Sequence, residues 1–330
     1  MTGYQEILTD PSYGGQIVTL TYPIVGNYGV NLQDFESKKI QVSGFVVRED
    51  CEQPSNWRSS GTLGEFLASQ GVPGISGVDT RALTRRLRSR GVMMGAISGD
   101  ESTDEMLERI RLSPSYGQVD YVSQVSTSTP YRWEDSFVEH DPAGPHIVVL
   151  DAGVKYNILR ILRQKGCRTT VLGHCASKEE ILGQRPDGVL LSPGPGDPAL
   201  LRHMVETVRD ILGAVPIMGI CLGHQLLGLA LGGHTFKLKF GHRGGNHPVK
   251  DLVTGQVHIT SQNHGYAVDA DSLRDGVEPS HINLNDGTVE GLLHRSLPLV
   301  SIQYHSEASP GPRDNMYLFD RFLDMVKASK

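Results

Sequence analysis

The feature that most constrains the fold is a regular alternation in the second half of the chain. Short, continuously apolar runs alternate there with segments of helical periodicity. Strands that are apolar throughout belong to parallel sheets buried on both faces, with helices as the crossover connections. We therefore predict an α/β fold with an open, mostly parallel sheet and helices on both faces. The expected strands are residues 147–150, 189–191 and 217–221, and the expected helices are residues 158–162, 203–212 and 226–231.

A polar, acidic segment with two prolines, residues 133–146, divides the chain. Such a change of composition is typical of a linker. The preceding part, residues 1–132, mixes strand-like runs with one helix-like stretch and predicts a smaller α+β domain. The second domain then covers residues 147–330. The remaining expected elements are strands at 17–22, 42–47, 257–260 and 300–303, and helices at 80–90 and 317–327.

Composition narrows the classes of function. The 330 residues carry 31 basic and 37 acidic side chains, and the net charge of −6 argues against nucleic acid or an anionic membrane as the main partner. No apolar run approaches the ~18 residues of a membrane span. Met1 leads into polar sequence, without the pattern of a secretory leader. The four cysteines form no C-x-x-C pair, so we expect a reducing cytoplasm rather than disulfides or a zinc knuckle.

A candidate nucleophile lies where an apolar run meets a helical segment, in the sequence GICLGHQ of residues 219–225. G-x-C-x-G is the thiol form of the nucleophile elbow, in which small residues two positions before and after the nucleophile allow a tight turn. A helix amino terminus favours the thiolate of Cys221. The alternative is an ordinary buried cysteine, which is the commonest role of a free one.

A candidate base and its orienting group follow in the segment QYHSE, residues 303–307. A thiol nucleophile needs a base, and the base needs a group that holds it. On an extended segment the side chains of His305 and Glu307 leave on the same face. We predict a triad of Cys221, His305 and Glu307, although a single histidine among 13 is most often a structural residue.

Acyl transfer also needs donors for the developing oxyanion. The segment LSPGPGDP, residues 191–198, ends a predicted strand in a loop that exposes backbone amides. The amide of Leu222, directly after the nucleophile, is the second natural donor. A stiff loop without a ligand is the alternative, and a phosphate site is not indicated, because neither G-K-[ST] nor G-x-G-x-x-G is present.

With these three motifs, the second domain resembles the class I (triad-type) glutamine amidotransferases, whose fold is flavodoxin-like. Further segments narrow the resemblance to the small subunits of carbamoyl-phosphate synthase, and it then covers essentially the whole chain. These segments are KFGHRGGNHP (239–248), SQNHGYAVD (261–269), EASPGP (307–312), TGYQEILTDPSY (2–13) and DTRALT (79–84).

The resemblance implies a site for L-glutamine. Neutral amides and hydroxyls can bind the ammonium and carboxylate groups of this amino acid without burying an unpaired charge. The spacing of the histidines indicates no metal site. The glutamine-lining residues that the resemblance implies are Ser12, Gly194, Gly196, Leu222, Gln225, Asn263, Gly265 and Tyr266.

The resemblance also implies a partner. Ammonia released here would pass to a large synthetase subunit that makes carbamoyl phosphate from bicarbonate and ATP for arginine and pyrimidine synthesis, in a heterodimer or larger heteromer. ATP and Mg²⁺ would bind that subunit, and this chain would hold no cofactor. Two alternatives stay open: a glutaminase subunit of another synthase, and a catalytically inactive regulatory subunit.

Two departures from the family pattern stand out. Ser306 occupies the position between His305 and Glu307 where the family usually has proline, which predicts a looser turn. The family also usually has strand-forming sequence ahead of the position of Met1, so we expect a shortened amino-terminal domain. Five arginines, which predict a solvated helix face or a contact with the large subunit, are Arg81, Arg85, Arg86, Arg88 and Arg90.

Overall fold

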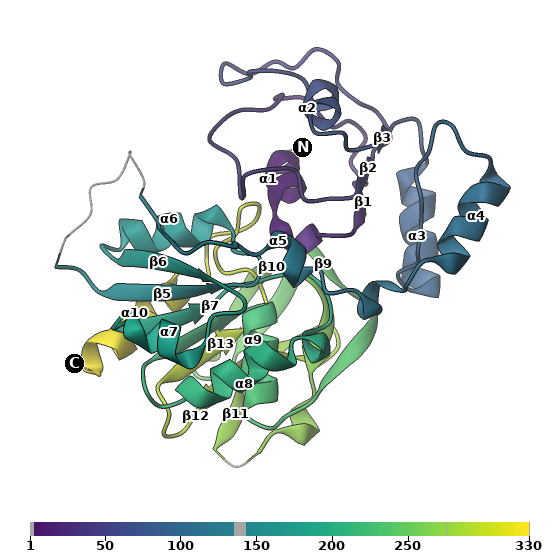
Figure 1. Ribbon diagram of the computed structural model, residues 1–330. Helices are drawn as coiled ribbons and strands as arrows, with labels where there is room; N and C mark the ends of the chain where they lie inside the picture. Colours follow the sequence, from purple (N-terminus) through teal and green to yellow (C-terminus); the bar gives the residue numbers. More distant parts are fainter. Residues whose placement is uncertain (1–2, 135–142, 275, 330) are drawn as a thin grey trace.

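The computed structural model describes residues 3–134, 143–274 and 276–329. In these ranges a ten-stranded sheet forms the body of the molecule, and a three-stranded sheet lies in the amino-terminal part (Figure 1). The large sheet has the strand order β10-β9-β11-β12-β13-β8-β7-β5-β6-β4. The catalytic candidates lie near the middle of this order, where β8 and β13 are neighbours.

Five neighbouring strands of the large sheet are parallel, and the apolar runs predicted all of them except β6. Their side chains are almost all buried, which agrees with a sheet covered on both faces. The predicted α/β fold class is therefore confirmed. These strands are β5 (His146–Asp151), β6 (Arg168–Gly173), β7 (Gly188–Leu191), β8 (Ile217–Ile220) and β13 (Leu299–Ile302).

Helices cover both faces of this parallel region (Figure 1). Val149 packs in one core cluster with residues of α6 and α10, and its neighbour Val148 packs in the other with residues of α8 and α9. This division follows from the alternation of side chains along a strand. The helices are α6 (Tyr156–Gln164) and α10 (Tyr317–Ala328) on one face, and α7 (Lys178–Gly183), α8 (Arg202–Ile211) and α9 (Leu222–Ala230) on the other.

The sheet continues beyond β13 through antiparallel strands, of which the sequence indicated only residues 257–260. The long strands β9 (Thr235–Asp251) and β10 (Val257–Val268) pair with each other, and β11 (Val277–Asn283) and β12 (Val289–His294) connect them to β13. Polar residues, histidines and glycines fill much of β9 and β10. These strands therefore lack the apolar runs by which a buried strand is recognised.

The amino-terminal part forms a separate small core. Tyr4 and Leu8 of α1 pack in one cluster with Phe45 of β2 and Leu63 of α2. The strand-like runs predicted at 17–22 and 42–47 contain β1 and β2, and all three strands are parallel. The elements are α1 (Tyr4–Thr9), the 3₁₀ turn η1 (Pro11–Tyr13), β1 (Ile17–Thr19), β2 (Gly44–Val46), α2 (Leu63–Ser69) and β3 (Gly74–Ile75).

Helices α3 (Thr80–Arg90) and α4 (Thr103–Leu112) project from the body as a pair (Figure 1). The bounds of α3 are those predicted, because Asp79 caps its first turn through the amide of Ala82 and Gly91 ends it. All five arginines of α3 are exposed or half-buried, and within the described residues none of them forms an ion pair. Short connections follow in η2 (Tyr116–Gln118) and α5 (Val122–Val125).

The predicted linker, residues 133–146, falls largely on residues 135–142, which lie outside the described residues. The large sheet already begins before this segment, because Tyr131 of β4 (Tyr131–Arg132) pairs with Val171 at the sheet's edge. No described helix combines the length and the apolar character that a membrane span needs.

Candidate active site

The loop between β8 and α9 forms a strained elbow at Cys221. Its φ of 52° and ψ of −103° lie in a region that side-chain-bearing residues rarely adopt. The two flanking glycines are sterically required. A Cβ at Gly219 would lie 2.6 Å from the carbonyl oxygen of Gly223, and one at Gly223 would lie 2.3 Å from that of Leu191. The close packing therefore selects glycine on both sides of the cysteine, as the motif predicts.

The sulfur of Cys221 is buried among polar groups from two segments, β10 and the residues directly after β13. The Nε2 of Gln303 lies 3.6 Å from Sγ, and the backbone oxygen of Asn263 lies 3.9 Å from it. His305 faces the same sulfur, because Cys221 is among the groups that raise the pKa of this ring. Nε2 of the His305 ring is buried without a hydrogen-bond partner in the described chain. This nitrogen is therefore available to the thiol and to a reacting group.

Glu307 holds the other nitrogen of this ring, because Nδ1 of His305 lies 2.6 Å from Oε1 of Glu307. Both side chains are at least 97% buried. The expected extended geometry is wrong: β13 ends at Ile302, and Ser306 and Glu307 lie in a turn. The positive φ of Ala308 (56°) and Ser309 (49°) bends the chain here, and the turn brings the side chains together. Ser306 in place of proline leaves this contact intact.

A buried lysine that the sequence did not single out completes the charge network. Nζ of Lys155 lies 3.2 Å from Oε1 of Glu307 and 3.9 Å from Oδ2 of Asp10, and it donates a 2.5 Å hydrogen bond to the oxygen of Ala308. Lys155 follows the carboxyl end of β5, and Asp10 belongs to the amino-terminal part. A polar residue after a buried parallel strand is the signal that could have found Lys155.

The pKa values follow from this network. Burial alone would raise the pKa of Glu307, but Lys155 and His305 lower it to about 2. Burial would likewise lower the pKa of His305, but Glu307 and Cys221 raise it to about 10. The pKa of Lys155 is raised by Glu307, Asp10 and Glu36 against the opposing effect of burial. His305 is therefore a cation at neutral pH, held between a carboxylate and the thiol.

The glycine loop after β7 lies against the start of α9. A Cβ at Gly194 would lie 2.9 Å from the side chain of Leu222 and 2.1 Å from the oxygen of Ala152. Gly196 has a φ of 96°, which favours glycine. The structure thus places the two predicted sources of oxyanion donors, the amide of Leu222 and the glycine loop, beside the nucleophile. Their role as donors stays a prediction.

The amino-terminal part reaches this site through η1. A Cβ at Gly14 would lie 3.3 Å from Pro195 of the glycine loop. Ser12 lies in the same turn and its amide donates to Oδ1 of Asp10, while its Oγ is buried and has no hydrogen-bond partner among the described residues. Asn263 on β10 has the same property at both polar atoms of its side chain. Buried polar groups rarely remain unpaired, so these atoms indicate a polar ligand.

The other residues predicted to line the site for L-glutamine differ in their contacts within the protein. Gln225 uses its Nε2 within the protein, donating to the oxygen of Tyr266 at 2.9 Å and to Oε1 of Gln303 at 3.0 Å. Gly265 lies at a bulge, where the register of β10 against β9 shifts between His264 and Tyr266. The side chain of Gln225 therefore fixes the position of β10, and its contact with glutamine stays a prediction.

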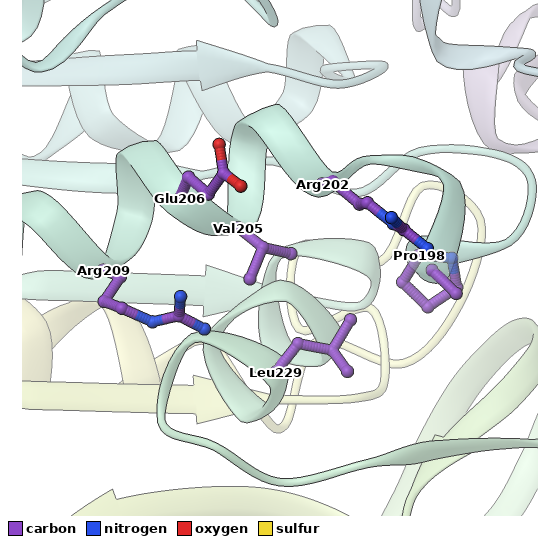
Figure 2. Close-up of a pocket in the computed structure, with 7 residues that line it drawn as sticks. Pro198, Arg202, Val205, Glu206, Arg209 and Leu229 are labelled. Carbon is purple, nitrogen blue, oxygen red and sulfur yellow. The ribbon is translucent and has the colours of Figure 1, made fainter.

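A surface pocket of about 350 Å³ lies elsewhere, between η3 (Pro198–Leu200), α8 and α9 (Figure 2). Aliphatic and charged side chains line it, with Arg209 and Glu206 on α8 and Leu229 on α9 (Figure 2). It contains no member of the predicted triad and none of the predicted glutamine residues. The buried, polar surroundings of Cys221 fit a small amino acid better than this open apolar pocket does.

Two groups of potential metal-ligating side chains come together among the described residues: one is His174, Cys175 and His203, and the other is His242, His264 and Glu290. In the first group, Nδ1 of His174 lacks the hydrogen bond that normally orients a ligating histidine. In the second group, the facing atoms already bond to one another or to neighbouring amides. Histidine spacing in the sequence did not indicate either group.

Comparison with known proteins places the chain in a family. Residues 1–97 match the CPSase domain of the carbamoyl-phosphate synthase small chain, and residues 148–325 match the class-I glutamine amidotransferases. A carbamoyl phosphate synthase small chain of Akkermansia muciniphila is 54% identical over 100% of this chain and 90% of that protein. The chain belongs to the carbamoyl phosphate synthase small chain family. It is accordingly a glutamine amidotransferase, and the predicted resemblance is confirmed.

Other relatives agree with this assignment. Small chains of Symbiobacterium thermophilum and Staphylococcus epidermidis are each 52% identical over 100% of this chain, and the matches cover 91% and 88% of those proteins. A solved structure of a putative GMP synthase subunit from Thermoplasma acidophilum covers 57% of this chain and 97% of its own, with a TM-score of 0.50 and 22% identity. This last similarity shows the fold alone.

Proposed function

We propose that the chain hydrolyses L-glutamine to glutamate and ammonia through Cys221, His305 and Glu307. The observation that carries the proposal is the arrangement of these three residues: the buried sulfur of Cys221, at a strained elbow, faces an imidazolium that a carboxylate holds at 2.6 Å. This is the geometry of nucleophile, base and orienting group in a triad. An inactive scaffold has no need of a strained elbow or of a buried imidazolium beside a thiol.

In the first half of the reaction, the thiolate of Cys221, whose proton is held by His305, attacks the side-chain amide carbon of glutamine. The amides of Leu222 and of the Gly194 loop stabilise the oxyanion of the tetrahedral intermediate. The carbon–nitrogen bond then breaks, and His305 gives its proton to the departing ammonia. This step leaves a γ-glutamyl thioester on Cys221 and a neutral His305, which Glu307 keeps oriented.

In the second half, His305 takes a proton from a water molecule, and the resulting hydroxide attacks the thioester carbon. The carbon–sulfur bond breaks, glutamate leaves, and Cys221 and His305 return to their starting state. The unpaired atoms of Ser12 and Asn263 supply polar contacts for the ammonium and carboxylate groups of the substrate. No step needs a metal or an organic cofactor on this chain.

The ammonia would pass to a large synthetase subunit, which would bind ATP and Mg²⁺ and form carbamoyl phosphate from bicarbonate. The match of the amino-terminal part to the small-chain CPSase domain supports this partner over another synthase. A labile intermediate favours a stable heteromeric complex, as a heterodimer or a larger assembly. Such a pathway operates in the cytoplasm, where the free cysteines would stay reduced.

The test is the glutaminase activity of the Cys221→Ser variant in complex with the large subunit. Removal of a triad nucleophile is expected to lower kcat on the order of 10⁴-fold or more. Carbamoyl phosphate synthesis from free ammonia should continue, because it bypasses Cys221. Cys51→Ser, at a half-buried cysteine of the amino-terminal part, is the matched control and should retain activity. Near-normal glutamine turnover by Cys221→Ser would contradict the mechanism.

A further inference from the structure

A buried polar cluster connects β9, β10, β11 and β12 beside the candidate active site. His242 on β9 lies opposite His264 on β10 in the strand register. Glu290 at the start of β12 and Asp286 in the turn before it approach His242 from the other side. His242, His264 and Glu290 are each at least 95% buried. The proposed reaction uses none of the four side chains, although His264 directly follows Asn263.

The hydrogen bonds determine where the protons of this cluster lie. Nδ1 of His264 is 2.7 Å from the backbone oxygen of Tyr266, so this nitrogen donates and Nε2 of the neutral ring is an acceptor. Nδ1 of His242 lies 3.2 Å from that acceptor, and Nε2 of His242 lies 2.9 Å from the carboxylate of Asp286. Both nitrogens of His242 therefore carry protons, and its ring is an imidazolium.

Charge supports the same assignment. Glu290 lies 3.3 Å from Nδ1 of His242, and its two oxygens accept from Asn283 at 2.8 Å and Gln262 at 3.0 Å. Burial would lower the pKa of His242, but hydrogen bonds and charges of Glu290 and Asp286 raise it. Burial and the charge of His242 lower the pKa of His264 well below its usual range.

The cluster acts on the site through the backbone of β10. The oxygen of Tyr266 accepts from both His264 and Gln225, and Gln225 in turn contacts Gln303 beside the sulfur of Cys221. The bond from His264 to Tyr266 spans the bulge at Gly265. This bulge sets the position of the Asn263 oxygen, which lies 3.9 Å from the sulfur of Cys221.

We propose that the His242 imidazolium, held by Asp286 and Glu290, is a positioning residue that fixes the His264 tautomer and thereby the glutamine-binding backbone of β10. The inference rests on the proposed glutaminase function. When His242 loses its Nδ1 proton and keeps the Nε2 proton that Asp286 accepts at 2.9 Å, two acceptor nitrogens face each other at 3.2 Å and the bulge is weakened. Glutamine binding should then suffer more than the chemical step, because Cys221, His305 and Glu307 lie outside the cluster.

This proposal predicts a pH dependence. The groups facing His242 are Asp286, Glu290 and His264 from the neighbouring strands and turn, and His247 from its own strand. Because the two carboxylates raise the pKa of His242, KM for glutamine should rise with pH as His242 loses its proton, at a higher pH than an ordinary histidine would give. Asp286→Asn removes one of the two carboxylates and should move this rise to lower pH.

The experiment measures kcat and KM for glutamine against pH in the complex with the large subunit. His242→Gln should raise KM about tenfold, the effect of about one lost hydrogen bond, and abolish the pH-dependent rise. Asp286→Asn should move the rise in KM to lower pH, and Asp286→Glu should keep the rise at the pH of the wild type. Asp271→Asn, an exposed aspartate on η4 (Ala270–Ser272), is the matched control and should leave the profile unchanged.

Two outcomes would overturn the inference. One is an Asp286→Asn enzyme whose KM for glutamine depends on pH as in the wild type, whether or not its melting temperature is lower. The other is stoichiometric zinc in the purified protein that His242→Gln removes, because a metal would then occupy the place of the proton. Failure of the proposed function would look different from failure of this inference. The wild-type enzyme would then show no glutaminase activity, or an activity that Cys221→Ser does not abolish.

Discussion

Cys221 and Glu307, at the two ends of the candidate triad, are held in place in different ways. Backbone packing holds Cys221: two glycines, a positive φ and the tight contact of β7, β8 and α9 leave the elbow little freedom. Charge holds Glu307, through Lys155 and His305 in a region sealed from water. The nucleophile therefore depends on shape that a short motif encodes, whereas Glu307 depends also on Lys155, a partner distant in sequence.

The largest expected effect comes from removing the charge of Glu307. Glu307→Gln should lower kcat for glutamine hydrolysis on the order of 10⁴-fold, because the amide no longer stabilises the His305 imidazolium. It should also change the pH dependence. The His305 cation is lost in the wild type as pH rises through about 10, and without Glu307 the pKa of His305 falls, so the alkaline loss of kcat should move to lower pH. An unchanged alkaline limit would contradict the role of Glu307.

The second prediction tests the buried cation behind Glu307. Lys155→Met should lower the free energy of unfolding by about 3–5 kcal/mol, because it leaves buried carboxylates without their partner. Chemical denaturation measures this change. Lys327→Met removes an exposed lysine paired with Asp324 and is the control, with no measurable loss expected. Equal losses of unfolding free energy in Lys155→Met and Lys327→Met would contradict the role of Lys155 as the buried partner of Glu307.

The third prediction tests the packing of the elbow around Cys221. Gly223→Ala should destabilise the protein by about 1–3 kcal/mol and lower glutaminase activity, because the added methyl group meets the backbone of Leu191. Gly183→Ala, at the end of α7, adds a methyl group with no atom within 4 Å and should be neutral. Thermal unfolding and kcat measure the two effects. Full activity of Gly223→Ala would mean that the elbow is less constrained than its packing indicates.

The smallest expected effect concerns the substrate contact from the amino-terminal part. Ser12→Ala should raise KM for glutamine about tenfold with little change in kcat, because it removes one hydrogen bond to a charged group. The free protein should be as stable as the wild type or more so, since Oγ of Ser12 is buried without a partner. Ser89→Ala on α3 is the matched control. A stability loss without a change in KM would make Ser12 structural.

The same contrast explains what could be predicted. The apolar runs of β5, β7, β8 and β13 are local, and with the helical periodicity they sufficed to predict a parallel sheet with α6, α8, α9 and α10, whereas β6 and α7 were not predicted. The motif around Cys221 is also local, and steric contacts account for both of its glycines. The strands β9, β11 and β12 were not predicted, because polar residues, glycines or proline interrupt them and they lack the apolar run by which a buried strand is recognised.

By itself, the sequence determined the parallel core, the elbow at Cys221 and the pairing of His305 with Glu307 as candidates. Only the tertiary structure placed Lys155 and Asp10 behind Glu307 and replaced the expected extended H-x-E segment by a turn. It alone also assembled the His242 cluster. The physical reason is that periodicity and steric fit act between near neighbours in the chain, whereas the energy of a buried charge depends on every group that folding brings around it.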